Sequence, residues 1–225
     1  MAKINFKKGL TDIVLYIIIF IVVQIFLTYA GAGIWAAVKG EGYQATLLAM
    51  GTGNNAILTA LTTVFSNVIT LIIFLKAQWT PLTRNYLQSK PWISLLWVAL
   101  FTLGAIIPLE FVYEQIGVEM DADTERVFAS LMKEPWGYVA IGILAPLAEE
   151  IVFRGAILRT LLDMVSKKNH WVAIFISAAA FGLIHGNKAQ FINALLMGLL
   201  LGWMYYRTKS LVPGILMHWV NNTMA

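Results

Sequence analysis

The chain has 225 residues, of which 59% are hydrophobic and 12% are charged, and its mean hydropathy is +0.74. A soluble domain carries about 25% charged residues, so this composition argues against a soluble helical bundle and indicates an integral membrane protein. The formal net charge of +4 is expected from membrane topology and anionic lipid rather than from a nucleic-acid partner. The chain contains no cysteine, which excludes a disulfide framework and a thiolate nucleophile.

Apolar stretches of about 20 residues, long enough to cross a hydrocarbon core of about 30 Å, recur along the chain. We predict an all-α fold, a polytopic membrane helix bundle of about seven transmembrane helices in a single integral membrane domain, residues 1–225. The predicted spans are Leu10–Tyr29, Asn55–Leu75, Trp92–Tyr113, Trp136–Leu162, Trp171–His185, Ala189–Tyr206 and Leu211–Met224.

The basic residues predict the orientation of the chain. Lys3, Lys7 and Lys8 precede the first span, and an inward N-terminus places most of the other basic loop residues in the cytoplasm as well. By the positive-inside rule, we expect a multi-pass plasma membrane protein with its N-terminus cytoplasmic and its C-terminus outside. The first apolar run is longer than that of a signal peptide and no small-residue cleavage site follows, so we expect a retained anchor.

Two connections and one pair of glycines have recognisable patterns. Gly31–Asn54 is rich in small residues and is predicted to be a flexible outer connection. Met120–Glu134 mixes apolar and charged residues as a short surface helix lying along the membrane would. Gly198 and Gly202 form a G-x-x-x-G pair in the sixth span, which predicts close helix packing rather than chemistry.

Polar residues inside the spans need an explanation, because a charged side chain at a helix centre costs at least about 2.5–3.5 kcal/mol. Asp12 and Glu110 lie near span ends and can reach the interface. Gln24, Asn67 and Asn193 are neutral and are expected to make interhelical hydrogen bonds. The remaining polar residues are concentrated in the last four spans: Glu149, Glu150, Arg154, His185, His218 and Asn222.

The spacing around the two glutamates predicts different roles for them. Glu150 and Arg154 are four residues apart, so on a helix they share one face and can form an ion pair. Glu149 points about 100° away and is left without a local partner, free to face a cavity. Pro146 is expected to loosen the backbone and bend the helix just before them.

The other polar residues repeat the same spacing on two later spans. His218 and Asn222 are four residues apart, as are Phe181 and His185. Each of the three helices can therefore offer a polar face to one interior point. Straight helices would place His185 nearer the outer face and His218 nearer the cytoplasm, so a kink, a tilt or a re-entrant segment must bring them together if they serve one site.

Two hydrolytic schemes fit these residues. His185 and His218 are candidate ligands of one divalent metal, zinc above all, which would activate a water and polarise a peptide carbonyl. Without a metal, Glu149 would activate the water, and one histidine with Asn222 would donate hydrogen bonds to the oxyanion. The chain has neither an H-E-x-x-H nor a G-x-S-x-G motif, which argues against a zincin-like site and a serine hydrolase elbow.

Three motifs resemble those of a known family. Residues 149–155 (EEIVFRG), 181–185 (FGLIH) and 218–222 (HWVNN) match its E-E-x-x-x-R, F-x-x-x-H and H-x-x-x-N motifs in order. The family is that of the CAAX proteases and bacteriocin-processing enzymes (CPBP, or Abi), related to the type II CAAX prenyl endopeptidases. The resemblance covers residues 136–225, which we predict to be the catalytic core.

The resemblance implies an intramembrane endopeptidase that acts on membrane-associated peptides or proteins, in some bacterial relatives in bacteriocin maturation or self-immunity. It implies that Glu149 activates water, with Glu150 beside it, that His185, His218 and Asn222 complete the site, and that Arg154 supports it. Both a metal-dependent and a glutamate-dependent enzyme are compatible with it. The expected partners are membrane lipid and a peptide or protein substrate, and no oligomeric state is predicted. The alternatives are a non-catalytic immunity or scaffold protein and, less favoured, an ion-coupled or proton-coupled transporter.

Overall fold

The structure is a computed structural model, and it describes residues 5–115, 117 and 119–224. The described residues contain helices and no strand, which confirms the all-α prediction. The helices are α1 (Phe6–Lys39), α2 (Tyr43–Gly51), α3 (Ala56–Lys76), α4 (Asn85–Gln88), α5 (Trp92–Gln115), α6 (Ala122–Met132), α7 (Pro135–Gly137), α8 (Ala145–Glu149), α9 (Arg159–Met164), α10 (His170–Leu183), α11 (Lys188–Thr208) and α12 (Val212–Met224). Three further segments are helical but not α-helical. The segments η1 (Tyr138–Leu144) and η2 (Glu150–Leu158) are π-helix, and η3 (Lys167–Asn169) is a 3-10 helix.

Four of the described helices, α1, α3, α5 and α11, are long and apolar enough to cross a membrane. Each coincides with a predicted span. The other three predicted spans are helical too, but α10 and α12 are shorter and the span Trp136–Leu162 is divided into several segments. The membrane bundle is therefore confirmed, while the number seven remains a prediction.

That divided span is one continuous helical run, Pro135–Met164, in which two segments are wound as π-helix. In a π-helix each N–H bonds to the carbonyl five residues back instead of four, and such turns are frequent at functional sites. Pro146 lies in the first turn of α8, between η1 and η2. The expected loosening of the backbone near this proline is thus seen as two π-helical segments, η1 before α8 and η2 after it.

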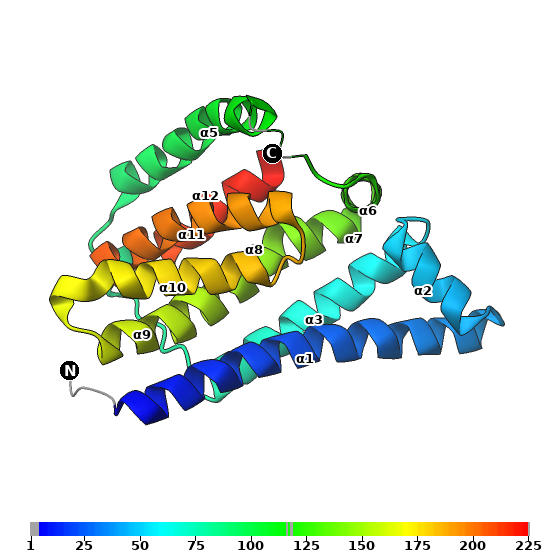
Figure 1. Cartoon of the computed structure of the whole chain (residues 1–225), viewed down its shortest axis with the longest axis horizontal. Coiled ribbons are helices and arrows are strands. Elements are labelled where there is room, and N and C mark those ends of the chain that lie inside the picture. Colours follow the sequence, from blue (N-terminus) through cyan, green and yellow to red (C-terminus); the bar gives the residue numbers. More distant parts are fainter. Residues whose placement is uncertain (1–4, 116, 118, 225) are drawn as a thin grey trace.

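The central position of this run is clear from its burial and its neighbours. Figure 1 shows it passing between the α1–α3 pair on one side and α10, α11 and α12 on the other. All nine residues of η2 are buried. The main hydrophobic core forms around them, with Phe20 of α1, Phe74 of α3 and Phe181 of α10 packed against its apolar side chains.

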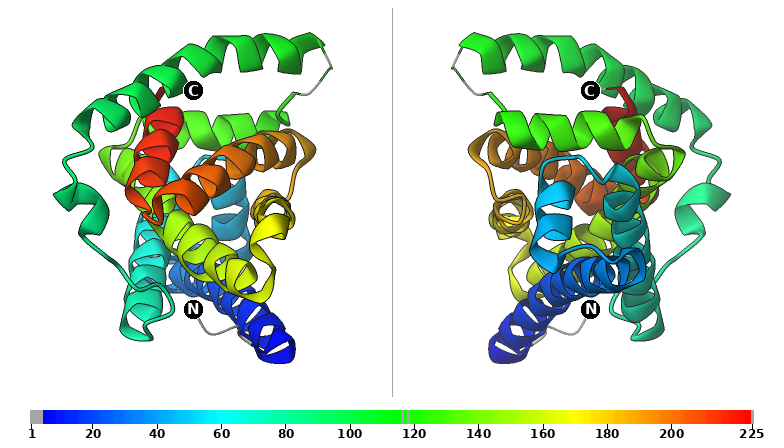
Figure 2. Two further views of the ribbon diagram at one scale, coloured as in Figure 1. Left: turned by 90° about the vertical axis from the view of Figure 1, so that its left-hand side faces the viewer. Right: turned by 90° about the vertical axis from the view of Figure 1, so that its right-hand side faces the viewer.

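The long helix α5, in contrast to η2, is almost entirely unburied. It arches over the outside of α12 in the side views (Figure 2), and Thr102 is its one buried residue. Its large apolar side chains, Trp97 and Phe101 among them, are exposed. An apolar helix with so little packing against protein is suited to contact with lipid.

The prediction for Gly31–Asn54 was wrong. Helix α1 continues through Gly31 to Lys39, and most of the remainder forms α2. A Cβ on Gly31 would overlap the methyl group of Thr62 on α3, so this glycine allows two helices to approach rather than loosening the chain. Gly40 ends α1 with a left-handed φ of 69°, a conformation that glycine adopts without strain.

A helix within Met120–Glu134 and close packing at the predicted glycine pair are both confirmed, while the position of that helix along the membrane stays a prediction. Helix α6 lies within Met120–Glu134 and begins at Asp121, whose side chain accepts a hydrogen bond from the Thr124 N–H. A Cβ on Gly198 would lie 2.9 Å from the Ala178 Cβ, and one on Gly202 the same distance from the Ile174 Cγ2. The glycine pair therefore brings α11 directly against α10.

Candidate functional site

The predicted ion pair lies at the centre of the molecule. The Arg154 Nη1 is 2.9 Å from the Glu150 Oε1, and each side chain is only 1% exposed. The guanidinium also stacks over the ring of Phe181, 4.4 Å from its centroid. The second carboxylate oxygen, Oε2 of Glu150, has no hydrogen-bond partner among the described residues. A buried charge pair costs desolvation energy, so its retention needs a reason beyond stability.

His218 on α12 reaches both glutamates. Its Nε2 lies 3.4 Å from the Glu149 Oε2, and its Nδ1 lies 3.4 Å from the Glu150 Oε1. The histidine side chain is 6% exposed and that of Glu149 is 16% exposed. The prediction that Glu149 has no partner holds within its own helix, but the partner comes from a helix almost seventy residues later in the chain.

This arrangement limits where protons can be. A neutral imidazole has a single N–H and donates to one carboxylate, whereas an imidazolium donates to both. Glu150 is already paired with Arg154, so it remains an acceptor for the Nδ1–H of His218. The Nε2 then faces Glu149, and a proton between these two atoms satisfies both. Glu149 and His218 thus form a pair of groups that can exchange a proton.

His185 follows the last turn of α10, and its ring meets the ring of Phe181 edge to face, with centroids 5.0 Å apart. The ring of His218 makes the same kind of contact with Phe181 at 5.7 Å. Both histidines therefore touch one aromatic ring, although among the described residues no hydrogen bond or ion pair joins His185 to either glutamate.

The tautomer of His185 follows from its hydrogen bond. Its Nδ1 is 2.9 Å from the Phe181 carbonyl oxygen. A carbonyl only accepts, so Nδ1 carries the proton, and in the neutral ring Nε2 is left as an acceptor or ligand. This form of His185 can hold a water but cannot donate to an oxyanion.

The Asn222 side chain forms a hydrogen bond to the central helical run. Its Nδ2 donates to the carbonyl oxygen of Ile141 in η1, at 3.1 Å. The amide therefore contacts the backbone of the central helical run rather than Glu149 or His218. Of the predicted residues, Glu149, Glu150, Arg154 and His218 come together directly, while His185 and Asn222 lie around them.

Several residues that the sequence did not single out support this cluster. The hydroxyls of Thr80 and Ser177 donate to the carbonyl oxygens of Ile151 and Phe153 in η2, at 2.7 and 3.0 Å. A Cβ on Gly214 would lie 2.7 Å from the Glu150 Oε2. Threonine, serine and glycine are common in apolar spans, so only their neighbours in three dimensions reveal these roles.

The residues as placed do not fit a metal site. A catalytic zinc is held by three protein ligands. The described residues contain no group of three or more His, Cys, Asp or Glu side chains that would hold a metal ion, because His185 does not join Glu149 and His218. The expected zinc therefore stays a prediction.

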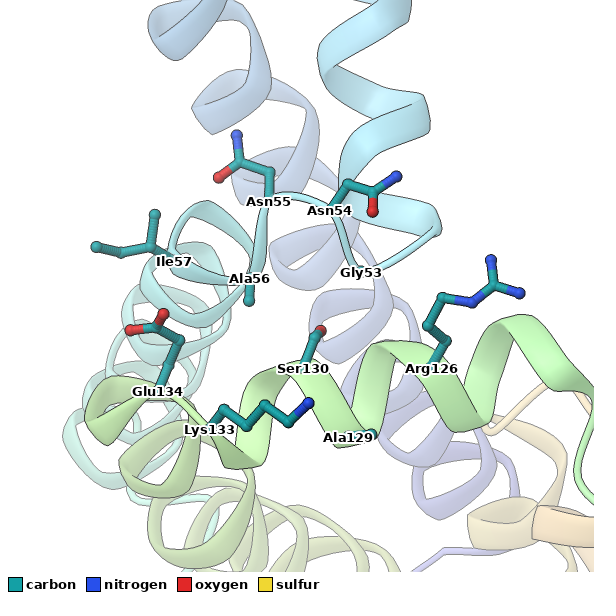
Figure 3. Close-up of a pocket in the computed structure, with 10 residues that line it drawn as sticks. All are labelled: Gly53, Asn54, Asn55, Ala56, Ile57, Arg126, Ala129, Ser130, Lys133 and Glu134. Atoms are coloured by element: carbon teal, nitrogen blue, oxygen red, sulfur yellow. The ribbon is translucent and has the colours of Figure 1, made fainter.

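Two cavities are lined by described residues outside the cluster. One of about 430 Å³ lies between the α2–α3 loop and α6, where Arg126 and Lys133 line one wall and Gly53 the other (Figure 3). The second, of about 310 Å³, is apolar and lies between α5, α11 and α12. Met217 and Asn221 of α12 line the second cavity.

Comparison with known proteins agrees with the three motifs. Residues 131–224 match the family described as type II CAAX prenyl endopeptidase Rce1-like. This match supports the resemblance of the C-terminal region to the CPBP family that the three motifs indicate. The match includes every residue of the cluster around His218.

A curated relative extends the similarity. The chain is 26% identical over 126 residues to the Bacillus subtilis (strain 168) protein named "Putative membrane peptidase YdiL". That alignment covers 53% of this chain and 50% of the relative, so the chain matches about half the length of that protein. No solved structure matches the chain. The name of this relative describes a membrane peptidase and includes no substrate.

Proposed function

We propose that the chain is an intramembrane endopeptidase that hydrolyses peptide bonds of membrane-associated peptides or proteins. The observation that carries the proposal is the placement of His218 between Glu149 and Glu150, buried at the centre of an apolar helix bundle. Ionisable groups inside a membrane span are costly and mark functional sites. The match of residues 131–224 to a peptidase family supports the same function, with residues 136–225 as the proposed catalytic core.

In the proposed mechanism, Glu149 acts as general base. Its carboxylate takes a proton from a water as the water oxygen bonds to the carbonyl carbon of the substrate, and the carbonyl electron pair moves to oxygen. The electron pair on the oxyanion then re-forms the carbonyl as the C–N bond breaks, and the proton passes from Glu149 to the leaving amine nitrogen. The products are a carboxylic acid and an amine, Glu149 is again a carboxylate, and water is the one reactant consumed besides the peptide.

The neighbouring residues hold and balance these charges. The acceptor Nε2 of His185 is suited to holding the water. His218, supported at Nδ1 by Glu150, is suited to donating toward the developing oxyanion when it is protonated. Arg154 pairs with the Glu150 carboxylate and holds it in place. The buried position makes each of these interactions stronger than it would be in water.

The test uses the purified full chain in liposomes with a panel of membrane-associated peptides, and the products are identified by mass spectrometry. Wild type is expected to cleave, and Glu149→Ala and His218→Ala are expected to lose cleavage. Variants that cleave as well as wild type would show that the site is wrong. If no peptide is cleaved under any condition, the non-catalytic binding alternative is favoured. Metal analysis of the same protein and chelator sensitivity decide between the metal and glutamate schemes.

We also propose that the N-terminus is cytoplasmic and the C-terminus is outside, on the basis of the basic residues near the first span. Because the chain has no cysteine, a single introduced cysteine gives an unambiguous label. An impermeant thiol reagent applied to intact cells is expected to modify Thr223→Cys and to spare Lys7→Cys. The reverse pattern would establish the opposite orientation.

A further inference from the structure

The turn that precedes Pro146 has an unusual hydrogen-bonding pattern. In η1 the Ala145 N–H donates to the Ala140 carbonyl, five residues back. In the same register, residue 146 would donate to the carbonyl of Ile141. Proline has no N–H, so this carbonyl loses its partner in the helix. A buried carbonyl without a donor costs about 1–3 kcal/mol.

Side chains from two other helices bind the carbonyls at this point. The Asn222 Nδ2, on α12, donates to the Ile141 oxygen at 3.1 Å. The Asn67 Nδ2, on α3, donates to the adjacent Ala140 oxygen at 3.4 Å. Asn67 in turn accepts a hydrogen bond from the amide of Gln24 on α1 at 3.3 Å, which confirms the interhelical bonding expected of these two residues. The wide turn is therefore held from both sides of the helical run.

Asn222 also lies one turn after His218 on the same face of α12. The two residues attach α12 to the helical run at two points, His218 at the glutamates and Asn222 at Ile141. The distance from His218 to Glu149 therefore depends on the bond made by Asn222. This hydrogen bond joins two parts of the same chain, so it forms without substrate.

We propose that Asn222 is a positioning residue: it replaces the N–H that Pro146 lacks, and it thereby sets the bend that places Glu149 against His218. This assignment rests on the proposed peptidase function. In this role the Asn222 amide acts through its bond to the Ile141 carbonyl. Asn67 supports the same turn from the opposite side.

A double-mutant cycle separates the two roles. Pro146→Ala supplies an N–H that is able to bond to Ile141, so it makes the Asn222 amide redundant. In the wild-type background, Asn222→Leu is expected to lower kcat about tenfold with little change in KM, and to lower the melting temperature. In the Pro146→Ala background, the same substitution is expected to have much smaller effects on both. Pro146→Ser is made in parallel, as a second source of the N–H.

The proposal is overturned if Asn222→Leu reduces kcat by the same factor in both backgrounds, because Asn222 then acts on the substrate. Asn193→Leu is the matched control, because Asn193 is also an amide in a span and bonds to Tyr113 on α5 at 3.2 Å. Its effect is expected to be the same with and without Pro146.

Melting temperatures keep this proposal separable from the peptidase function. They are measured without substrate, so the coupling between residues 146 and 222 is observable even if wild type cleaves no peptide. Absence of cleavage with coupled melting temperatures would reject the function and retain the bond. Additive melting temperatures in both the alanine and serine backgrounds would reject the role of the bond itself.

Discussion

Helix α5 and segment η2 are both parts of predicted membrane spans, yet their surroundings are opposite. Of the 24 residues of α5 only Thr102 is buried, whereas all nine residues of η2 are buried. The lipid-facing helix is apolar over most of its length, and the enclosed segment contains Glu150 and Arg154. A bilayer cannot satisfy polar groups, but surrounding protein can. The comparison explains why the charged residues and the widened turns are located in the enclosed segment.

The largest predicted effect tests the enclosed charge pair. Arg154→Leu leaves the Glu150 carboxylate buried without its partner, and we expect a loss of about 3–5 kcal/mol in stability. Thermal unfolding in detergent measures it, with Trp97→Leu on exposed α5 as the control of small effect. Glu150→Leu combined with Arg154→Leu should be more stable than Arg154→Leu alone. An Arg154→Leu variant as stable as the Trp97→Leu variant would contradict this account.

Two glycines test how tightly each region is packed. Gly214→Ala places a methyl group 2.7 Å from the Glu150 Oε2, so we expect a loss of about 1–3 kcal/mol from overpacking and a fall in cleavage. Gly104→Ala on α5 has no atom within 4 Å of the new Cβ, and alanine should stabilise the helix by about 0.5–1 kcal/mol. Equal melting temperatures for the two variants would contradict the difference in packing density between the enclosed site and α5.

Hydroxyl groups provide a finer test of the π-helical turns. The Thr80 hydroxyl donates to the Ile151 carbonyl of η2, and the Thr63 hydroxyl donates to the Thr59 carbonyl of its own helix. Thr80→Val is expected to cost about 1–3 kcal/mol because it leaves a buried carbonyl less satisfied, whereas Thr63→Val should cost less than about 1 kcal/mol. Chemical denaturation of both variants checks the order, and a larger loss for Thr63→Val would reverse the argument.

The smallest expected effect lies outside the spans, at α6. Hydrogen bonds from the N–H and hydroxyl of Thr124 hold the pKa of Asp121 below its ordinary value of 3.8. Its contribution to α6 is therefore fully present above pH about 3.8 and is lost as the pH falls through the lower, folded pKa. Amide exchange of α6 should accelerate below that pH in wild type. Asp121→Asn should show no such acceleration, and a pH dependence that it shares with wild type would assign the effect elsewhere.

Much of the fold could be predicted from apolar length alone, and part of the site from short-range spacing. The pairing of Glu150 with Arg154 follows from their separation of four residues, and the structure confirms it. The partner of Glu149 could not be predicted, because His218 comes from a different helix. Gly31–Asn54 was misinterpreted for a related reason, since glycine permits either flexibility or close packing and only the neighbouring helix decides which.

The π-helical segments also had no signal of their own in the sequence. Pro146 indicated a disturbed backbone. Whether the backbone then forms π-helical turns depends on which side chains donate hydrogen bonds to its carbonyl oxygens. Here those groups are Asn222, Thr80 and Ser177, each from a separate part of the chain. The roles of the individual site residues remain predictions that only activity measurements test.

The most direct measurement compares two glutamates, one from each region. Glu149 lies beside His218 in the enclosed site, and Glu110 is exposed on α5. Single-turnover cleavage of one peptide is measured in the same liposomes for wild type, Glu149→Gln and Glu110→Gln, in water enriched in ¹⁸O to confirm hydrolysis. The account predicts that Glu149→Gln slows cleavage by about 10²–10⁴-fold and that Glu110→Gln cleaves at the wild-type rate. Cleavage by Glu149→Gln at the wild-type rate would contradict the assignment of Glu149 as the base.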